Sequence, residues 1–132
     1  MLILKKEHFN SVVKQCTREL PNEACGMLAG KAHKVEKVYE MTNSEKSPET
    51  FFMDAKEQLK IMKEIRALGL EMIGIYHSHV ASPPYPSSHD VELAFYPEAS
   101  YVIVSLKDKA KPSVRSFKIQ DGKITEEEVK TE

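Results

Sequence analysis

The 132-residue chain lacks the features that mark several large protein classes. It has no apolar run near the roughly 20 residues of a membrane-spanning helix, and no basic segment followed by a long apolar stretch that would indicate a secretory signal. Nineteen Lys and Arg nearly balance twenty Asp and Glu, so no field of one sign is available to hold nucleic acid or an anionic membrane. We therefore expect a cytoplasmic protein that binds neither nucleic acid nor a membrane.

Cysteine is also scarce, with only two residues and no Cys-x-x-Cys spacing. This excludes a disulfide framework and disfavours a zinc site built from thiolates. Cys16 and Cys25 both lie among apolar residues, which is typical of reduced, buried thiols.

The length suits one domain with one hydrophobic core, and no internal repeat is present. A composition that is 41% hydrophobic and 30% charged excludes disorder over the whole chain. We expect residues 1–132 to form a single domain.

Hydrophobic periodicity predicts an α/β or α+β fold with about six strands and two main helices. One helix is expected over residues 6–20, before Pro21, and a second after Asp54 as its N-cap, ending at Gly69. The apolar or alternating segments that we interpret as strands are 25–29, 35–41, 70–76, 101–106, 113–119 and 124–129. A short helix is expected over residues 90–95.

Two connecting segments differ in character. Residues 42–49 are polar and contain proline, which predicts a solvated loop. Residues 80–88 contain three prolines, which excludes regular structure and predicts a stiffened loop.

One segment carries residues suited to chemistry, namely His77-Ser78-His79 at the end of a predicted strand. Residues i and i+2 of a strand point to the same side, so both imidazoles can face one point. If the proline-rich loop folds back, Asp90 can join them. Two nitrogens and one carboxylate form the three-ligand set of catalytic zinc sites, whereas a structural zinc takes four protein ligands.

Each of these residues also has a simpler interpretation when taken alone. His77 and His79 could be ordinary buried or surface histidines, and Asp90 could be the N-cap of the short helix that follows it. Glu23 could be an exposed glutamate and His89 a solvent-facing histidine. Their joint spacing is more informative than any single position.

This spacing resembles that of the JAMM or MPN-plus family of zinc metalloproteases, whose pattern is an upstream Glu, His-Ser/Thr-His, seven residues and Ser-x-x-Asp. The matching positions are Glu23, His77, Ser78, His79, Ser87 and Asp90, with residues 80–86 as the seven-residue spacer. The flanking segment 21–30 is also similar to the Glu-bearing strand entry of the family. One departure is Val80, where many members have proline, which affects the shape of the loop but removes no ligand.

The resemblance implies an MPN-type domain with a cytidine-deaminase-like mixed sheet and one catalytic Zn(II) held by His77, His79 and Asp90. It further implies that Glu23 is the general base and that Ser87 donates a hydrogen bond to the developing oxyanion. Ser78 is expected to have a structural role at the end of the strand.

The family's small prokaryotic members imply a substrate class, because they cleave ubiquitin-like β-grasp proteins and sulfur carriers after a C-terminal Gly-Gly. Larger members that cut between ubiquitin units carry two insertions, and this chain has only the short segments 42–53 and 96–100 in comparable places. We expect a minimal peptidase or isopeptidase acting on such a carrier.

Three other functions fit these residues less well. A non-catalytic MPN-type scaffold would typically lack some ligands, and a passive metal-binding protein would have no use for Glu23 or Ser87. A nucleobase deaminase would need His-x-Glu and Pro-Cys-x-x-Cys, which are absent. Phe51, Phe52 and Tyr85 could line either a substrate groove or the contact of a homodimer.

Overall fold

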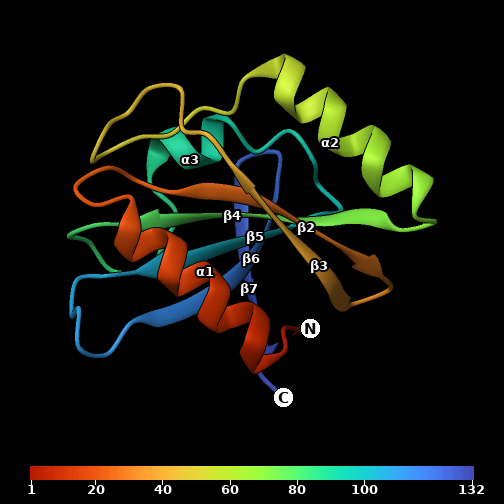
Figure 1. Cartoon of the computed structure of the whole chain (residues 1–132). Helices are drawn as coiled ribbons and strands as arrows, with labels where there is room; N and C mark the ends of the chain where they lie inside the picture. The colour runs from red at the N-terminus through yellow and green to blue at the C-terminus, as the bar shows by residue number, and fades with distance from the viewer.

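The computed structural model describes all 132 residues, which form one eight-stranded mixed sheet and three helices (Figure 1). The helices are α1 (Lys6–Arg18), α2 (Ala55–Ala67) and α3 (Ser88–Glu92). The strands are β1 (Leu2–Ile3), β2 (Cys25–Lys31), β3 (Lys34–Met41), β4 (Glu71–His79), β5 (Ser100–Ser105), β6 (Ser113–Gln120), β7 (Lys123–Glu127) and β8 (Val129–Lys130). The predicted α/β class is confirmed. The sheet has eight strands where about six were predicted, because the two-residue strands β1 and β8 are too short to show periodicity.

The strand order is β7-β6-β5-β4-β2-β3-β1-β8. The central strands β4 and β5 are parallel, and the β2–β4 and β5–β6 pairs are antiparallel. β7 and β8 stand at opposite ends of this order although only Glu128 separates them, so the last segment of the chain links the two edges of the sheet. The segment predicted as one strand over 124–129 therefore belongs to two strands, β7 and β8, at opposite edges of the sheet.

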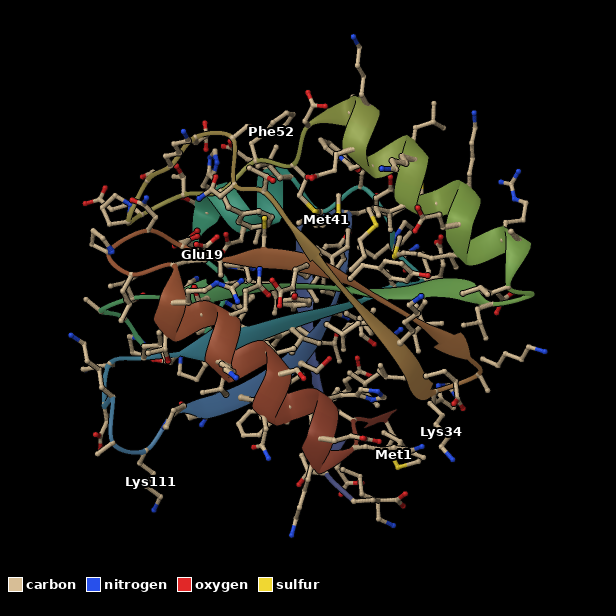
Figure 2. The ribbon with its side chains drawn as sticks, in the orientation of Figure 1. Met1, Glu19, Lys34, Met41, Phe52 and Lys111 are labelled. Atoms are coloured by element: carbon tan, nitrogen blue, oxygen red, sulfur yellow. The ribbon has the colours of Figure 1, made fainter.

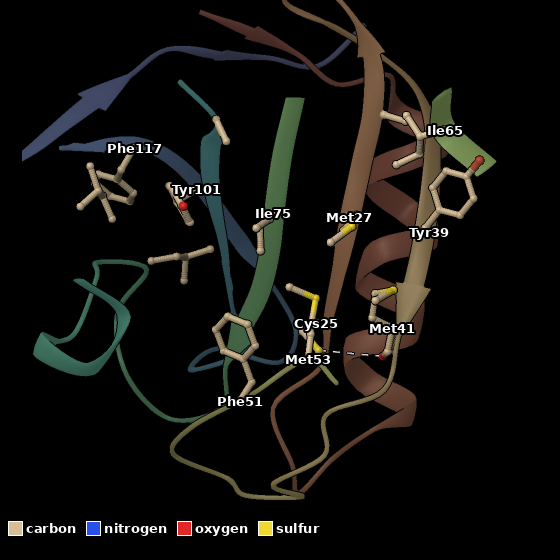
Figure 3. Packing of buried hydrophobic residues seen from close by; sticks show 14 residues of the cluster. Cys25, Met27, Tyr39, Met41, Phe51, Met53, Ile65, Ile75, Tyr101 and Phe117 are labelled. Atoms are coloured by element: carbon tan, nitrogen blue, oxygen red, sulfur yellow. Dashed lines mark hydrogen bonds between the residues drawn. The ribbon is translucent and has the colours of Figure 1, made fainter. Parts of the chain in front are cut away.

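Alternate residues of each central strand enter cores on opposite faces of the sheet, as the pleat requires. Leu28, Tyr76 and Val102 pack on the face that α1 covers. Met27 and Ile75, labelled in Figure 3, belong with Ile103 to the other core, to which α2 contributes Ile65 and α3 contributes Val91. The order of the layers is helix, sheet, helix.

The helix boundaries follow local sequence signals. α1 buries Val12, Gln15 and Cys16 and ends at Arg18, slightly before the expected stop at Pro21. Asp54 caps α2 as predicted, by accepting hydrogen bonds from two backbone N–H groups, and Gly69 takes the positive φ of +73° that ends it. No helix of the structure has the length and apolar character needed to cross a membrane.

One glycine permits the close approach on which the sheet depends. A Cβ atom added to Gly26 of β2 would lie 2.2 Å from the ring of Tyr76 on β4. Tyr76 is fully buried there, and its hydroxyl donates a hydrogen bond to the buried Gln15 of α1. The glycine therefore makes room for the side chain that joins α1 to the strand bearing the histidines.

Candidate active site

β4 continues through His79, farther than the predicted strand over 70–76, and so carries both histidines in extended backbone. Their side chains lie on the same face, with the Nε2 atoms of His77 and His79 only 3.2 Å apart. Both residues are buried. The pleat of one strand thus brings two imidazole nitrogens close together, as the His-x-His spacing predicted.

Asp90 completes this group because the loop over residues 80–87 folds back over the end of β4. Its Oδ2 atom lies 3.2 Å from Nε2 of His77 and 3.0 Å from Nε2 of His79. His77, His79 and Asp90 are the one group of three potential metal ligands in the chain.

A capping box at the start of α3 orients Asp90. Ser87 is the N-cap, and its Oγ accepts a hydrogen bond from the Asp90 N–H at 3.1 Å, while the Ser87 N–H donates to Asp90 Oδ2 at 2.9 Å. The interpretation of Asp90 as the N-cap is wrong, because the third helical position gives its carboxylate the reciprocal role in the box.

The proline-rich loop is held to the sheet at several points. The Pro83 carbonyl lies 2.9 Å from Nδ1 of His79, which makes Nδ1 the donor to that carbonyl and turns Nε2 toward Asp90. The Ser105 hydroxyl donates to the Ser82 carbonyl at 2.6 Å. Valine at position 80 is compatible with this arrangement and displaces no ligand.

The donor set fits a tetrahedral divalent cation. Bonds of about 2.0–2.1 Å place the donors of a tetrahedral zinc site roughly 3.3 Å apart, close to the separations between these three atoms. Although burial opposes ionisation of Asp90, hydrogen bonds from His77 and His79 hold its pKa well below the usual range. Burial lowers the pKa of His77. An ionised carboxylate and a neutral imidazole are the protonation states that bind metals.

His79 balances opposing influences. Burial alone would lower its pKa, but hydrogen bonds to Asp90 and to the Pro83 carbonyl raise the pKa above its ordinary value. A cation between the three donors would take the place of the proton that Asp90 attracts.

Glu23 lies beside this group through the pairing of β2 with β4. Cys25 is opposite His77, and the next residues continue the antiparallel pattern, with the Ser78 N–H donating to the Ala24 carbonyl at 3.0 Å. Glu23 therefore falls opposite His79, on the histidine side of the sheet. It is 4% exposed, which makes its interpretation as an exposed glutamate wrong.

The Glu23 carboxyl is poorly solvated. Its Oε1 atom is buried without a hydrogen-bond partner, and burial raises its pKa to about 8. A carboxyl in this state can accept and release a proton near neutral pH.

Two other residues named from the sequence, Ser87 and His89, lie at the start of α3 beside Asp90 in the chain. Ser87 is exposed, and since its oxygen accepts the bond from Asp90 N–H, its hydroxyl proton is free for another acceptor. His89 is half-buried, with a buried Nε2 that has no partner, so its interpretation as solvent-facing is wrong. It does not join the potential metal ligands.

The aromatic residues beside the site have separate roles. Phe51, labelled within the hydrophobic cluster of Figure 3, is 8% exposed and so is no exposed contact residue. It stacks on the His77 ring, with centroids 4.5 Å apart and an angle of 24° between the planes. Phe52, in the loop joining β3 to α2 (Figure 2), is 44% exposed. It lines an apolar pocket to which His77 and Asp90 also belong. Tyr85 packs edge-on against Phe117 outside the pocket.

Three further residues that line this pocket were not predicted from the sequence. These residues are Leu93, Phe95 and Tyr96, which follow α3. Phe95 is 68% exposed, and its aromatic character after the Asp90 helix was the one available signal.

The chain is similar to curated peptidases over nearly its whole length. It is 40% identical over 131 residues to the CysO-cysteine peptidase of Mycobacterium tuberculosis, covering 98% of this chain and 90% of the relative. It is 35% identical over 131 residues to the desampylase of Pyrococcus furiosus, covering 99% and 91%.

Solved structures agree with this similarity. A solution structure from Desulfitobacterium hafniense has a TM-score of 0.92 and 41% identity, covering 100% of this chain and 93% of that one. A JAB1/MPN domain protein from Archaeoglobus fulgidus shares the fold, with a TM-score of 0.66 at 17% identity and coverage of 99% and 96%. Residues 5–120 match the family described as prokaryotic homologs of the JAB domain. With the relatives being peptidases, the chain belongs to this prokaryotic JAB-domain family, within the JAMM class of metalloproteases.

Proposed function

We propose that this chain is a zinc-dependent peptidase or isopeptidase that cleaves the amide bond after the C-terminal Gly-Gly of a ubiquitin-like or sulfur-carrier protein. The observation that carries the proposal is the convergence of the His77, His79 and Asp90 donor atoms beside the buried, unpartnered carboxyl of Glu23. The names of the relatives, CysO-cysteine peptidase and desampylase, support this substrate class.

His77 and His79 would hold the ion through Nε2 and Asp90 through Oδ2. Bound there, zinc supplies a Lewis acid and a water of lowered pKa. Glu23 takes a proton from the attacking water at a carboxylate oxygen and returns it to the leaving amine nitrogen. Its pKa of about 8 suits both transfers. The Ser87 hydroxyl donates a hydrogen bond to the oxyanion that develops on the scissile carbonyl.

The carrier tail would approach as an extended segment. Glycine residues suit a narrow site because they let the backbone pass close to the histidines without a Cβ atom. Strand addition offers main-chain hydrogen bonds to such a tail, and the apolar pocket between Phe52 and Phe95 is open to a side chain before the diglycine.

Hydrolysis of a β-grasp carrier with a short extension after Gly-Gly tests the proposal. The zinc-loaded protein should release the extension at the glycine, and Glu23→Gln should lower kcat by about 10³-fold or more, since proton transfer contributes that order. Glu71→Gln, an exposed glutamate at the start of β4, is the matched control and should leave the rate unchanged. Full turnover by Glu23→Gln, or cleavage elsewhere in the carrier, would contradict the proposal.

The scaffold alternative is disfavoured because similar curated proteins are named as a peptidase and a desampylase and because this chain retains every ligand position. The cytoplasmic location and the possible homodimer stay predictions.

A further inference from the structure

The main-chain N–H and carbonyl of Glu23 both form hydrogen bonds with the loop between β3 and α2. The Glu23 N–H donates to the Ser47 carbonyl at 2.8 Å, and the Glu23 carbonyl accepts from Nδ2 of Asn43 at 3.0 Å. Neither partner belongs to β2 or β4. The position of the Glu23 main chain therefore depends on a segment some 20 residues farther along the chain.

Asn43 uses its whole side-chain amide. Nδ2 also donates to the Thr50 carbonyl at 3.0 Å, while Oδ1 accepts from the N–H groups of Glu45 at 3.1 Å and Phe52 at 3.2 Å. The two carbonyls and two N–H groups around it are satisfied by one orientation of the amide alone. Asn43 is 8% exposed, so these bonds form in a largely dry environment, where losing one is costly.

The same loop reaches the metal-ligand side of the site. Phe52, whose N–H binds Asn43 Oδ1, follows Phe51, which stacks on His77. The amide of Asn43 thus joins the main chain of Glu23 to the stretch that packs on a ligand ring. A side chain with this bonding pattern does more than order a surface loop.

We propose that Asn43 is a positioning residue for Glu23: by tying the loop over residues 43–52 to the Glu23 carbonyl, it aims the carboxylate at the attacking water. Its effect on catalysis rests on the proposed function, whereas its effect on the Glu23 main chain does not. Because proton transfer depends on placement to well under 1 Å, loosening this contact should slow turnover without weakening substrate binding.

Three variants separate this role from simple loop folding. Asn43→Leu keeps the approximate volume and removes all four hydrogen bonds. Asn43→Asp keeps the acceptor for Phe52 and Glu45 and replaces the donor to the Glu23 carbonyl, and it decides the outcome if the leucine variant does not fold. Ser44→Ala is the matched control, since it removes a hydroxyl bond to the Phe52 carbonyl in the same loop, and that hydroxyl makes no hydrogen bond to Glu23.

Amide hydrogen exchange of the metal-free protein provides a readout without substrate. The Glu23 N–H bonds to the Ser47 carbonyl of the loop that Asn43 ties down, so loosening that loop should expose it. We expect this amide to exchange about tenfold faster in both Asn43 variants and to be unchanged in Ser44→Ala. Unchanged exchange at Glu23 in the folded Asn43 variants would overturn the proposal, whether or not the enzyme cleaves a carrier.

The kinetic readout is a split between kcat and KM on the extended carrier. Asn43→Leu and Asn43→Asp should lower kcat by about 10–100-fold, with KM within about twofold and zinc affinity within about threefold of the parent protein. Loss confined to KM, or a fall in kcat that merely follows weaker zinc binding, would contradict a positioning role through Glu23.

Discussion

Ser78 and Ala24 form a reciprocal pair, in which the Ala24 N–H donates to Ser78 Oγ at 2.8 Å and the Ser78 N–H donates to the Ala24 carbonyl at 3.0 Å. One partner lies between the two histidines and the other directly follows Glu23. The residue between the ligands, pointing to the opposite face of the sheet, thus holds the strand that carries the proposed base.

Replacing Ser78 should therefore be costly although it faces away from the site. Ser78→Ala leaves the buried Ala24 N–H without its acceptor, and we expect the free energy of unfolding to fall by about 1–3 kcal/mol in urea denaturation. Ser113→Ala, at an exposed position of β6, should change it by less than about 0.5 kcal/mol. Equal stability of the two variants would show that the pair contributes nothing.

Zinc affinity should depend on the three proposed ligands and not on the other histidines. We expect the purified protein to bind about one zinc ion and to lose cleavage activity on chelation. His77→Ala should weaken binding by more than about 100-fold, because it leaves two donors, whereas His33→Ala, at an exposed turn, should not. Zinc competition with a chromogenic chelator measures both, and comparable binding by the two variants would exclude this site.

The raised pKa of Glu23 predicts that ionisation of its carboxyl, which the proposed role as a base requires, lowers the stability of the folded protein. Because its pKa is raised to about 8, its contribution to stability is greatest below pH 4.5 and is lost as the pH rises through 8. In metal-free protein, Glu23→Gln should be more stable than the parent by several kcal/mol at pH 9, up to about 5 kcal/mol for the full shift, and by less than about 1 kcal/mol at pH 5. Thermal denaturation across this range is the measurement, with Glu71→Gln as control; a pH-independent difference would refute the raised pKa.

Ser87 has two separable roles. Ser87→Ala should remove the N-cap at a cost of about 1 kcal/mol and, by removing the hydroxyl donor, lower kcat about 10²-fold. Ser87→Thr retains a hydroxyl for both and should recover most of each. Ser88→Ala, the adjacent exposed serine, serves as control. If Ser87→Ala lowered stability but left kcat normal, Ser87 would act only as the N-cap of α3 and not as a donor to the oxyanion.

The two cysteines should resist alkylation in the folded protein. Burial raises the pKa of both Cys16 and Cys25 to about 12, so at pH 8 they hold about 10³-fold less thiolate than a free cysteine. Iodoacetamide should label them slowly until the protein unfolds. Since the folded pKa values exceed the unfolded ones, stability should also fall as pH rises above 8.5. Rapid labelling of native protein would contradict their burial.

Sequence patterns predicted the elements whose signals are local. The apolar spacing in α1, the Asp54 cap and Gly69 end of α2, and the alternation in β3 each depend on residues within a few positions of one another. The two-residue strands β1 and β8 carry no such signal, because their existence depends on pairing with distant partners.

The candidate site divides in the same way. The His-x-His spacing and the short path to Asp90 specify three converging donors, since a strand pleat and a capped helix turn have nearly invariant geometry. The surroundings of Glu23 could not be predicted in this way, because nothing in the sequence of residues 42–49 distinguishes Asn43 from a solvated loop residue.

By itself, the sequence determined which groups can do chemistry here: two imidazoles, a carboxylate at the right spacing, an upstream glutamate and a serine. The tertiary structure alone decided how they are supported, by placing Asn43 on the Glu23 carbonyl, Phe51 on the His77 ring and Ser78 on Ala24. These contacts join segments 20 to 54 residues apart. They arise from strand register and from the burial of a few polar groups, which only the assembled sheet specifies.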